Sequence, residues 1–311
     1  LQTSSIAWLI RVFERKARMA AVDNSIQIVQ SQSPLREALR AFRQSWAGML
    51  GILILILVIL FTFAGPFFYP VDPFEIVWAP LTPPGAAEQA PLGTDYLGRD
   101  ILAGLIHGGS ATLYVGLAAG FITITIGILI GAFAGFYRGM VDELLMRVTE
   151  FFQVLPALLF AMVLVTLFSP TIYVIALAIG IVSWPTTARL TRAEFLRIRN
   201  LEYVNAARSI GARNQRIIWR VILPNALAPL IVAATLTIGI AILFEAGLSF
   251  LGLGDPNVFS WGLMIGAGRE YILDGWWVVT LPGFMIFLTV LGFSLVGDGL
   301  NDAFNPKLRE R

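Results

Sequence analysis

The sequence predicts an all-α, polytopic membrane protein with six transmembrane helices. Of its 311 residues, 57% are hydrophobic and only 14% are charged, and the mean hydropathy is +0.77. A soluble domain carries about 25% charged residues, so this composition argues against a soluble enzyme. Long uncharged runs separate the charges, and each can cross a bilayer core about 30 Å thick as a helix of roughly 20 residues. These runs are 44–71, 101–137, 151–188, 221–244 and 275–297.

The placement of Lys and Arg predicts how often each run crosses. Ser169-Pro170-Thr171 interrupts the third run and suggests a turn between two spans. With two spans there and one in 101–137, all of the 22 Lys and Arg residues except Arg99 and Arg269 fall on the side that holds both termini. Because cytoplasmic loops are enriched in Lys and Arg, both termini are expected in the cytoplasm. The expected spans are 47–68, 110–137, 149–168, 171–188, 224–250 and 276–298.

Residues 1–46 are expected to form a cytoplasmic tail that ends in an interfacial helix. Ser33 suits the N-cap of this helix, and Pro34 suits its first position. Apolar residues then recur at helical spacing beside arginines, as in a helix that lies at the membrane surface. The apolar residues are Leu35, Leu39, Phe42 and Trp46, and the arginines are Arg36, Arg40 and Arg43. The alternative to an interfacial helix is that this segment is a solvated linker.

The remaining segments complete the expected topology. Residues 69–109 form an outer loop that is rich in Pro and Gly, and residues 110–298 form a core domain of spans two to six with a cytoplasmic loop at 189–222. Residues 299–311 form a cytoplasmic tail. Residue 1 is Leu, which suggests that the native start lies elsewhere, and we expect no cleaved signal peptide because the apolar core begins too late.

Small residues and prolines are placed where they affect helix packing. Glycines four apart let membrane helices approach closely, either in general packing or at an interface with a partner subunit. Span two contains Gly116, Gly120, Gly127, Gly131 and Gly135. Proline lacks an N–H group and therefore permits a kink. Pro156, Pro185 and Pro229 lie in or near the expected spans.

The composition excludes several kinds of chemistry. Cysteine is absent and His107 is the single histidine, so the sequence has no disulfide, no Cys-based metal site and no HExxH motif. Lys16 and Lys307, the two lysines, do not belong to a GxxxxGK[ST] phosphate-binding loop. We therefore expect no metal, no cofactor and no ATP hydrolysis in this chain. We also do not expect a membrane-embedded enzyme, because the sequence offers no plausible nucleophile–base pair.

Glu245 is the only carboxylate deep in an expected span, which makes it a candidate functional residue. Its position in span five places it near the outer interface, followed by Ser249 and Phe250. It could accept structural hydrogen bonds at an outer gate, contact a solute, or couple transport to protons. Without a partner His, Lys or second acid, it makes a poor proton relay.

The cytoplasmic loop at 189–220 carries 8 Arg against 2 acids. Gly211 is expected to stop a first helix within it, and a second helical stretch runs towards Pro224. The first helix has an apolar stripe at positions i, i+3, i+4 and i+7: Tyr203, Ala206, Ala207 and Ile210. With Arg208, Arg213 and Arg216 beside it, this pattern predicts a docking surface with charge complementarity. A basic loop that only follows the charge bias is the alternative.

This loop resembles the EAA motif of ABC importer permeases, EAA-x3-G-x9-I-x-LP. The matching residues are Asn205-Ala206-Ala207, Gly211 and Leu223-Pro224, with Asn205 in place of Glu and Val221 in place of Ile. Residues 92–100 (LGTDYLGRD) resemble a signature of the C-type subunits of dipeptide and oligopeptide permeases. Further matches at Met146-Arg147, 245–254, Trp261-Gly262 and 297–307 extend the resemblance over residues 50 to 308 approximately.

The resemblance implies a type I ABC importer permease (MetI-like) fold and a non-catalytic subunit in a bacterial or archaeal plasma membrane. It also implies that the cytoplasmic loop contacts a cytosolic ATPase, whereas the outer gate is expected from the position of Glu245 in span five. The ATPase contact would comprise Tyr203, Asn205, Ala206, Ala207, Arg208, Ile210, Gly211 and Pro224. The gate would comprise Glu245, Ser249 and Phe250.

The partners that the resemblance implies are a homologous B-type permease, two D/F-type ATPase subunits that bind ATP and Mg²⁺, and an extracytoplasmic solute-binding protein. Membrane lipid surrounds the subunit, and no nucleic acid is involved. The expected solutes are dipeptides or oligopeptides. Nickel chelates, glutathione and opines are alternatives within the same class of transporter, and a stand-alone secondary transporter is a more distant one.

Overall fold

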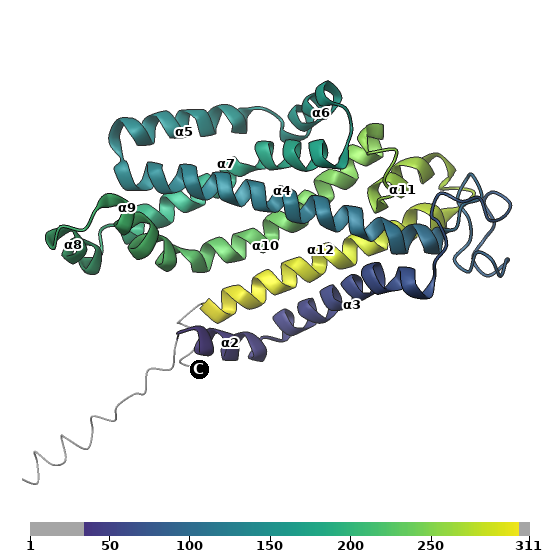
Figure 1. Ribbon diagram of the computed structural model, residues 1–311, viewed down its shortest axis with the longest axis horizontal. Coiled ribbons are helices and arrows are strands. Elements are labelled where there is room, and N and C mark those ends of the chain that lie inside the picture. The colour runs from purple at the N-terminus through teal and green to yellow at the C-terminus, as the bar shows by residue number, and fades with distance from the viewer. Residues whose placement is uncertain (1–33, 305–311) are drawn as a thin grey trace, which may run out of the picture. The chain divides into compact units, whose positions relative to one another are not determined.

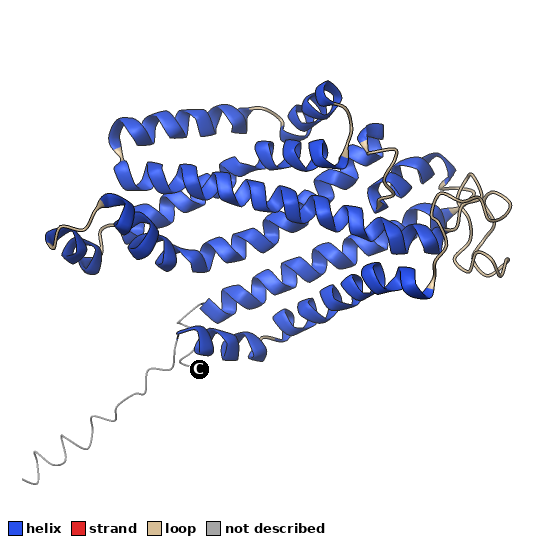
Figure 2. Ribbon diagram, viewed as in Figure 1, coloured by secondary structure: helices blue, strands red, loops and turns tan. Residues whose placement is uncertain are grey.

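The computed structural model describes residues 34–304, and the regular structure in this range is helical apart from isolated β-bridges in the 69–100 segment (Figures 1 and 2). The predicted all-α fold is confirmed. The longer helices are α2 (Pro34–Gln44), α3 (Trp46–Phe68), α4 (Ile101–Tyr137), α5 (Gly139–Val154), α6 (Ala157–Phe168), α7 (Ile172–Ile198), α10 (Leu223–Leu248) and α12 (Trp276–Phe304). The shorter ones are α8 (Glu202–Ser209), α9 (Asn214–Arg216) and α11 (Trp261–Gly268), with π-helical turns η1 (Ile217–Ile222) and η2 (Ser249–Leu253) and the 3₁₀ turn η3 (Arg269–Tyr271).

Within the described range, five helices are long and apolar enough to cross a membrane: α3, α4, α7, the continuous helix Asn214–Leu253 and α12. They overlap expected spans one, two, four, five and six. Helix α4 begins at Ile101, α7 runs to Ile198 and α12 runs to Phe304, so these helices extend beyond the expected spans. Parts of the expected 69–109 and 189–222 loops and of the 299–311 tail are therefore helical.

The third expected span, 149–168, is not one continuous helix. Helices α5 and α6 meet at an angle of 85°. Pro156 lies at the break, lacks an N–H group, and disfavours helical geometry at Leu155, which is extended at ψ 129°. The 12 residues of α6 span only about 18 Å, which is less than a bilayer core. The sequence analysis named Pro156 as a residue that permits a kink, and the chain breaks sharply at this residue. With the bent pair counted as one crossing, the described range holds up to six spans.

The expected N-terminal helix begins at Pro34, as predicted, but ends at Gln44 before Trp46 is reached. Ser45 instead caps the next helix, because its Oγ accepts a hydrogen bond from Gly48 N at 3.3 Å. Trp46 therefore belongs to α3 and is 81% exposed. The expected N-cap Ser33 and the rest of the 1–33 tail lie outside the described residues.

Helix α4 packs against α7 along much of its length and also contacts α10 and α3 (Figure 1). Its glycines make these approaches possible. A Cβ on Gly127 or Gly135 would lie 2.5 or 2.6 Å from a Cβ atom of α7, and one on Gly116 would lie 2.5 Å from Ile242 of α10. The glycines of span two that were predicted to permit close packing therefore serve contacts within the chain.

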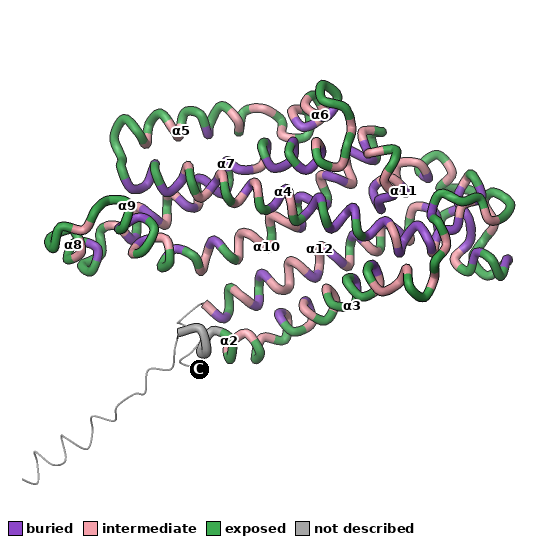
Figure 3. The backbone as a smooth tube through the Cα atoms, viewed as in Figure 1, coloured by how far each residue is buried: buried purple, intermediate pink, exposed green. Residues whose placement is uncertain are grey.

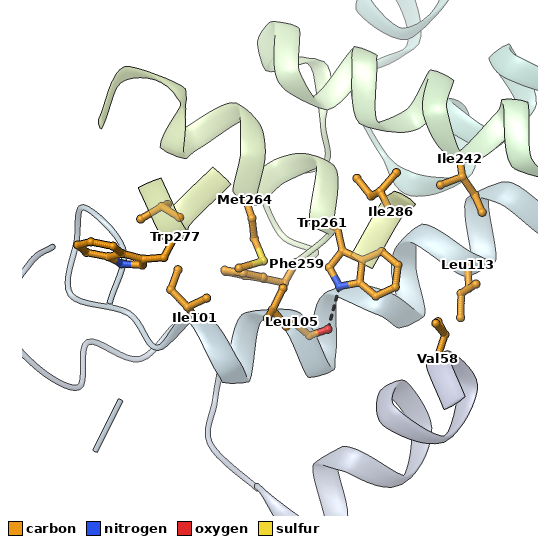
Figure 4. Packing of buried hydrophobic residues seen from close by; sticks show 11 residues of the cluster. Val58, Ile101, Leu105, Leu113, Ile242, Phe259, Trp261, Met264, Trp277 and Ile286 are labelled. Atoms are coloured by element: carbon orange, nitrogen blue, oxygen red, sulfur yellow. Dashed lines mark hydrogen bonds between the residues drawn. The ribbon is translucent and has the colours of Figure 1, made fainter. Parts of the chain in front are cut away.

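Buried apolar residues form clusters at different levels of the bundle, and α4 contributes to each of them. Buried positions accordingly recur along the length of α4 (Figure 3). Figure 4 shows the cluster near the 69–100 segment, where Trp261 is fully buried and its Nε1 donates to Leu105 O at 2.8 Å. A middle cluster joins α4, α6, α7 and α10. A third cluster joins the far end of α4 to α7, α8, η1 and α10.

The 92–100 segment, which carries the LGTDYLGRD motif, has a structural role in the fold. Asp100 caps α4 by accepting from Leu102 N at 2.9 Å, and its other oxygen accepts from the Tyr69 hydroxyl at 2.6 Å. Asp95 closes its own turn by accepting from Leu97 N and Arg99 N. Burial raises the pKa of the Asp95 carboxyl, although these backbone hydrogen bonds oppose that shift. The two aspartates of the motif therefore fix the entry into α4.

Replacing Gly131 by Ala should destabilise the α4–α7 contact. The added Cβ would overlap Ala188 O and lie 2.6 Å from Thr191 Cβ, and a backbone oxygen in a packed helix cannot move aside easily. We expect a loss of about 1–3 kcal/mol, measured as a lower unfolding temperature in detergent. Gly283→Ala is the control, because the nearest atom to its added Cβ would be 4.0 Å away. Equal unfolding temperatures for the two variants would contradict the packing argument.

Candidate functional site

Helix α8 lies at the end of the bundle opposite the 69–100 segment (Figure 1). Val204 fixes it there, because this side chain is fully buried in the cluster formed by Phe136, Phe195, Ile217 and neighbouring residues. These residues come from α4, α7 and η1, so α8 rests on several of the long helices at once. The predicted stripe did not include Val204, whose burial depends on the tertiary packing.

The face of α8 that points away from Val204 is uncovered in the isolated chain. Tyr203 is 44% exposed and Ile210 is 85% exposed, and Ala206 between them is exposed as well. Ala207 is half-buried and Asn205 is exposed. Small side chains in the centre with larger apolar ones at the ends form a surface that a partner can approach closely.

Gly211 ends α8 with a Schellman motif, as the sequence predicts for a helix stop. Its φ of +79° is left-handed, and glycine adopts this conformation without a Cβ clash. Ala212 N donates to Ala207 O at 3.1 Å, and Gly211 N donates to Arg208 O at 2.9 Å, which satisfies the last carbonyl groups of the helix. The turn sets the direction in which the chain returns towards α9 and α10.

The arginines of this region divide into two groups. The guanidinium groups of Arg208 and Arg199 lie 5.6 and 5.9 Å from the centre of the Phe136 ring, and Arg199 Nη1 also donates to Phe136 O at 2.6 Å. Arg208 thus helps hold α8 against α4, and Arg199 helps hold the end of α7 against α4. Arg213 and Arg216 are exposed, so they remain available for charge complementarity with a partner.

Pro224 lies inside a continuous helix rather than at the start of a span. The chain is helical from Asn214 to Leu251, and Pro224 follows the π-helical turn η1, where Leu223 N donates to Ile218 O. A π-turn accommodates a residue that has no N–H group to donate, because it changes the hydrogen-bond register locally. The α8 surface is thus joined to α10 without a flexible hinge at Pro224.

Glu245 lies where α10 meets the start of α11. Its Oε1 accepts from Ser249 Oγ at 2.8 Å and from Ser260 Oγ at 2.9 Å, and the side chain is only 3% exposed. Ser260 also caps α11 by accepting from Leu263 N at 3.0 Å. Among the described residues, Glu245 Oε2 has no hydrogen-bond partner. The sequence analysis left three roles open for Glu245, and this geometry favours the structural one.

The other expected gate residues lie in different surroundings. Ser249 is buried and bonded to Glu245, whereas Phe250 is 40% exposed. Arg269 lies with its guanidinium 5.3 Å from the Phe250 ring and donates to Phe250 O. The sequence analysis missed Ser260, although a Ser directly before Trp261-Gly262 is an N-cap signal that could have revealed it.

These observations define a polytopic helical membrane protein with an exposed short helix, α8, held firmly at one end of the bundle. Comparison with protein families gives a match over residues 127–310 to the binding-protein-dependent transport system inner membrane component, and over residues 33–91 to the N-terminal transmembrane domain of oligopeptide transport permease C. The chain belongs to the family of inner membrane components of binding-protein-dependent transport systems. It is accordingly a multi-pass membrane protein and a non-catalytic permease subunit.

Similar curated proteins cover nearly the whole chain. The di/tripeptide transport system permease protein DppC of Pseudomonas aeruginosa is 42% identical over 89% of this chain and 93% of its own length. The dipeptide transport system permease protein DppC of Bacillus subtilis is 39% identical over 90% of this chain and 88% of its own length. The oligopeptide transport system permease protein OppC of the same organism is 35% identical over 90% of this chain and 92% of its own length. The resemblance to C-type permease subunits is confirmed.

Solved structures agree on the fold. Chains of the methionine ABC transporter MetNI in inward-facing conformations match with TM-scores of 0.54 and 0.51 and sequence identities of 21% and 22%. They cover 63% and 61% of this chain, and 93% and 91% of their own length. The predicted MetI-like fold is thereby confirmed.

Replacing Gly211 by Val should loosen the end of α8. A β-branched residue in the left-handed conformation costs about 1–2 kcal/mol, whereas Asn tolerates it better. We expect faster hydrogen exchange at the amides of residues 211 and 212 in Gly211→Val, with a much smaller change in Gly211→Asn. Unchanged exchange in the Val variant would show that the turn does not depend on glycine.

Replacing Glu245 by Gln should preserve the junction of α10 and α11, because the amide oxygen can still accept from both serines. Glu245→Ala leaves these hydroxyls without their acceptor and should cost about 1–3 kcal/mol, seen as a lower unfolding temperature. Uptake by Glu245→Gln should follow the same pH dependence as the wild type from about pH 5 to pH 8. A flattened profile would instead support proton coupling.

Proposed function

We propose that this chain forms one half of the membrane pathway of an ATP-driven importer for dipeptides or short oligopeptides. Family membership and the names of relatives at 35–42% identity support this assignment. The chain has no phosphate-binding loop of its own, so the energy of ATP must reach it through a contact with another subunit.

The exposed face of α8 is the observation that carries this proposal. Tyr203, Ala206 and Ile210 form an uncovered apolar surface, while Val204 holds the same helix firmly on the bundle. A contact surface that transmits force must be accessible to its partner, and its other side must be rigidly attached to the helix bundle. Helix α8 meets both conditions. A cytosolic ATPase subunit that grips this face would move α7 and the helix Asn214–Leu253 together.

The assembly that we propose contains a homologous B-type permease, two D/F-type ATPase subunits and an extracytoplasmic solute-binding protein. ATP and Mg²⁺ bind to the ATPase subunits, and this chain binds no cofactor. The α8 end faces the cytoplasm together with both termini, because nearly all Lys and Arg residues fall on that side. The 69–100 segment then faces the solute-binding protein.

Replacing Ala206 by Arg should uncouple the transporter. The long side chain would stand on the centre of the α8 surface and prevent close approach of the ATPase. We expect peptide uptake and solute-stimulated ATP hydrolysis to fall at least about tenfold, which corresponds to about 1.4 kcal/mol in the contact, while the protein still inserts into the membrane.

Ala206→Ser is the control matched in size, and we expect it to remain coupled. Both variants are measured in proteoliposomes that contain the complete transporter, after their amounts in the membrane have been equalised. Wild-type uptake by Ala206→Arg would refute the assignment of α8 as the coupling contact. Uptake by this chain without any ATPase would refute the importer assignment itself.

A further inference from the structure

A cavity of about 810 Å³ lies between the α5–α6 break, α7 and α10. This volume falls within the range of small-molecule sites, which is about 300–1,000 Å³. Its walls are mainly apolar and include Phe152, Val182, Leu236 and Phe244. It is separate from the α8 surface and from the Glu245 cluster, and neither of those sites explains it.

The polar groups of this cavity are uncharged. The described residues that line it include Gln153, Ser183, Thr186, Thr187 and Thr237, and no Asp, Glu, Lys, Arg or His is among them. The nearby Arg189 does not line the cavity, and its Nη1 donates to Gln153 Oε1 at 3.0 Å. The walls therefore offer hydroxyl and amide groups for hydrogen bonding without a fixed charge.

The α5–α6 break and a proline inside α7 both lie at the cavity. Leu155, Pro156 and Ala157, which form the α5–α6 break, line it, and so does Pro185 inside α7. Helix ends and prolines leave backbone groups without helical partners. At membrane depth such groups are tolerated only inside protein or beside water, so the cavity is expected to be hydrated.

We propose that this cavity is a solute-binding site within the chain, which receives the amide backbone of a short peptide through neutral hydrogen-bonding groups and does not select for side-chain charge. The proposal rests on the assignment of the chain to a peptide importer. A fixed carboxylate or guanidinium would attract one sign of charge and repel the other strongly at short range. Walls without charge avoid this bias, and charged side chains of the solute keep their hydration in the water that fills the cavity.

Thr237 offers the sharpest test, because introducing a charge there should create the selectivity that the native cavity lacks. We compare Thr237→Asp with Thr237→Asn, which has nearly the same shape and no charge. Uptake of alanyl-aspartate, alanyl-alanine and alanyl-lysine is measured in proteoliposomes that contain the complete transporter. Each rate is divided by the wild-type rate for the same peptide, which cancels the preference of the solute-binding protein.

We expect Thr237→Asp to lower the normalised uptake of alanyl-aspartate about tenfold relative to that of alanyl-lysine. Thr237→Asn should affect the three peptides equally. If Asp and Asn give the same pattern for all three peptides, the solute does not pass this cavity and the proposal is wrong. If the wild type transports no peptide at all, the peptide assignment fails instead, so the two failures can be distinguished.

Removal of a hydroxyl group provides a matched control. Thr237 and Thr166 both donate to the carbonyl group four residues earlier, at 2.8 Å in each case, but Thr166 lies on α6 and does not line the cavity. Thr237→Val should therefore reduce uptake of all three peptides severalfold, and Thr166→Val should not. A larger effect at Thr166 would contradict the proposed site.

A labelling experiment keeps the proposal testable if Thr237→Asp fails to insert into the membrane. The chain contains no cysteine, so Ser183→Cys and Thr237→Cys each introduce a single thiol. A hydrophilic maleimide should label this chain at both positions in the assembled transporter, and a transported dipeptide should slow the reaction. Absence of labelling at both positions would show that the cavity is dry and would overturn the proposal.

Discussion

The need to satisfy every backbone polar group inside a bilayer governs the arrangement of this chain. Where the helices are continuous, the requirement is met internally, and α4 can press its glycines directly onto α7 and α10. Where proline interrupts a helix, another partner is needed. The break at Pro156 and Pro185 inside the continuous helix α7 border the same cavity.

The helices that border the cavity are also those that carry α8. Helix α7 lines the cavity with Ser183 and Pro185, and its last residues, Phe195 and Ile198, lie in the buried cluster that holds Val204. The helix that contains α10 lines the cavity with Thr237, and Ile217 and Ile218 at its beginning pack in the same cluster. Because the helix passes through Pro224 without a break, displacement of α8 acts on both walls through stiff elements.

The sequence was sufficient to predict most of the spans, the short helix in the cytoplasmic loop and its stop at Gly211, because these depend on hydropathy, charge bias and local turn chemistry. It did not reveal that α4 extends back to Ile101. Polar and small residues such as Gly108 and Gly109 look unfavourable for a span, and only their burial against Trp261 explains the helix. The break at Pro156 was visible only as a permitted kink, and the roles of Val204 and Ser260 depend on residues that are distant in sequence.

The bent pair α5–α6 adds a further element to this arrangement. Arg192 holds Asp142 with paired hydrogen bonds of 2.5 and 2.7 Å, and Arg189 holds Gln153 at 3.0 Å, so α5 is tied to α7 at both of its ends. Bidentate geometry makes the first of these contacts directional as well as attractive. Beyond Pro156 the chain leaves this tether, and α6 packs in the middle cluster against α7. The wall of the cavity that contains the break is therefore anchored on both sides of the bend, so a rotation of α7 that originates at α8 carries this wall with it. Motion of α8 would consequently reshape the cavity as a unit, which is the property that the proposed coupling to an ATPase subunit requires.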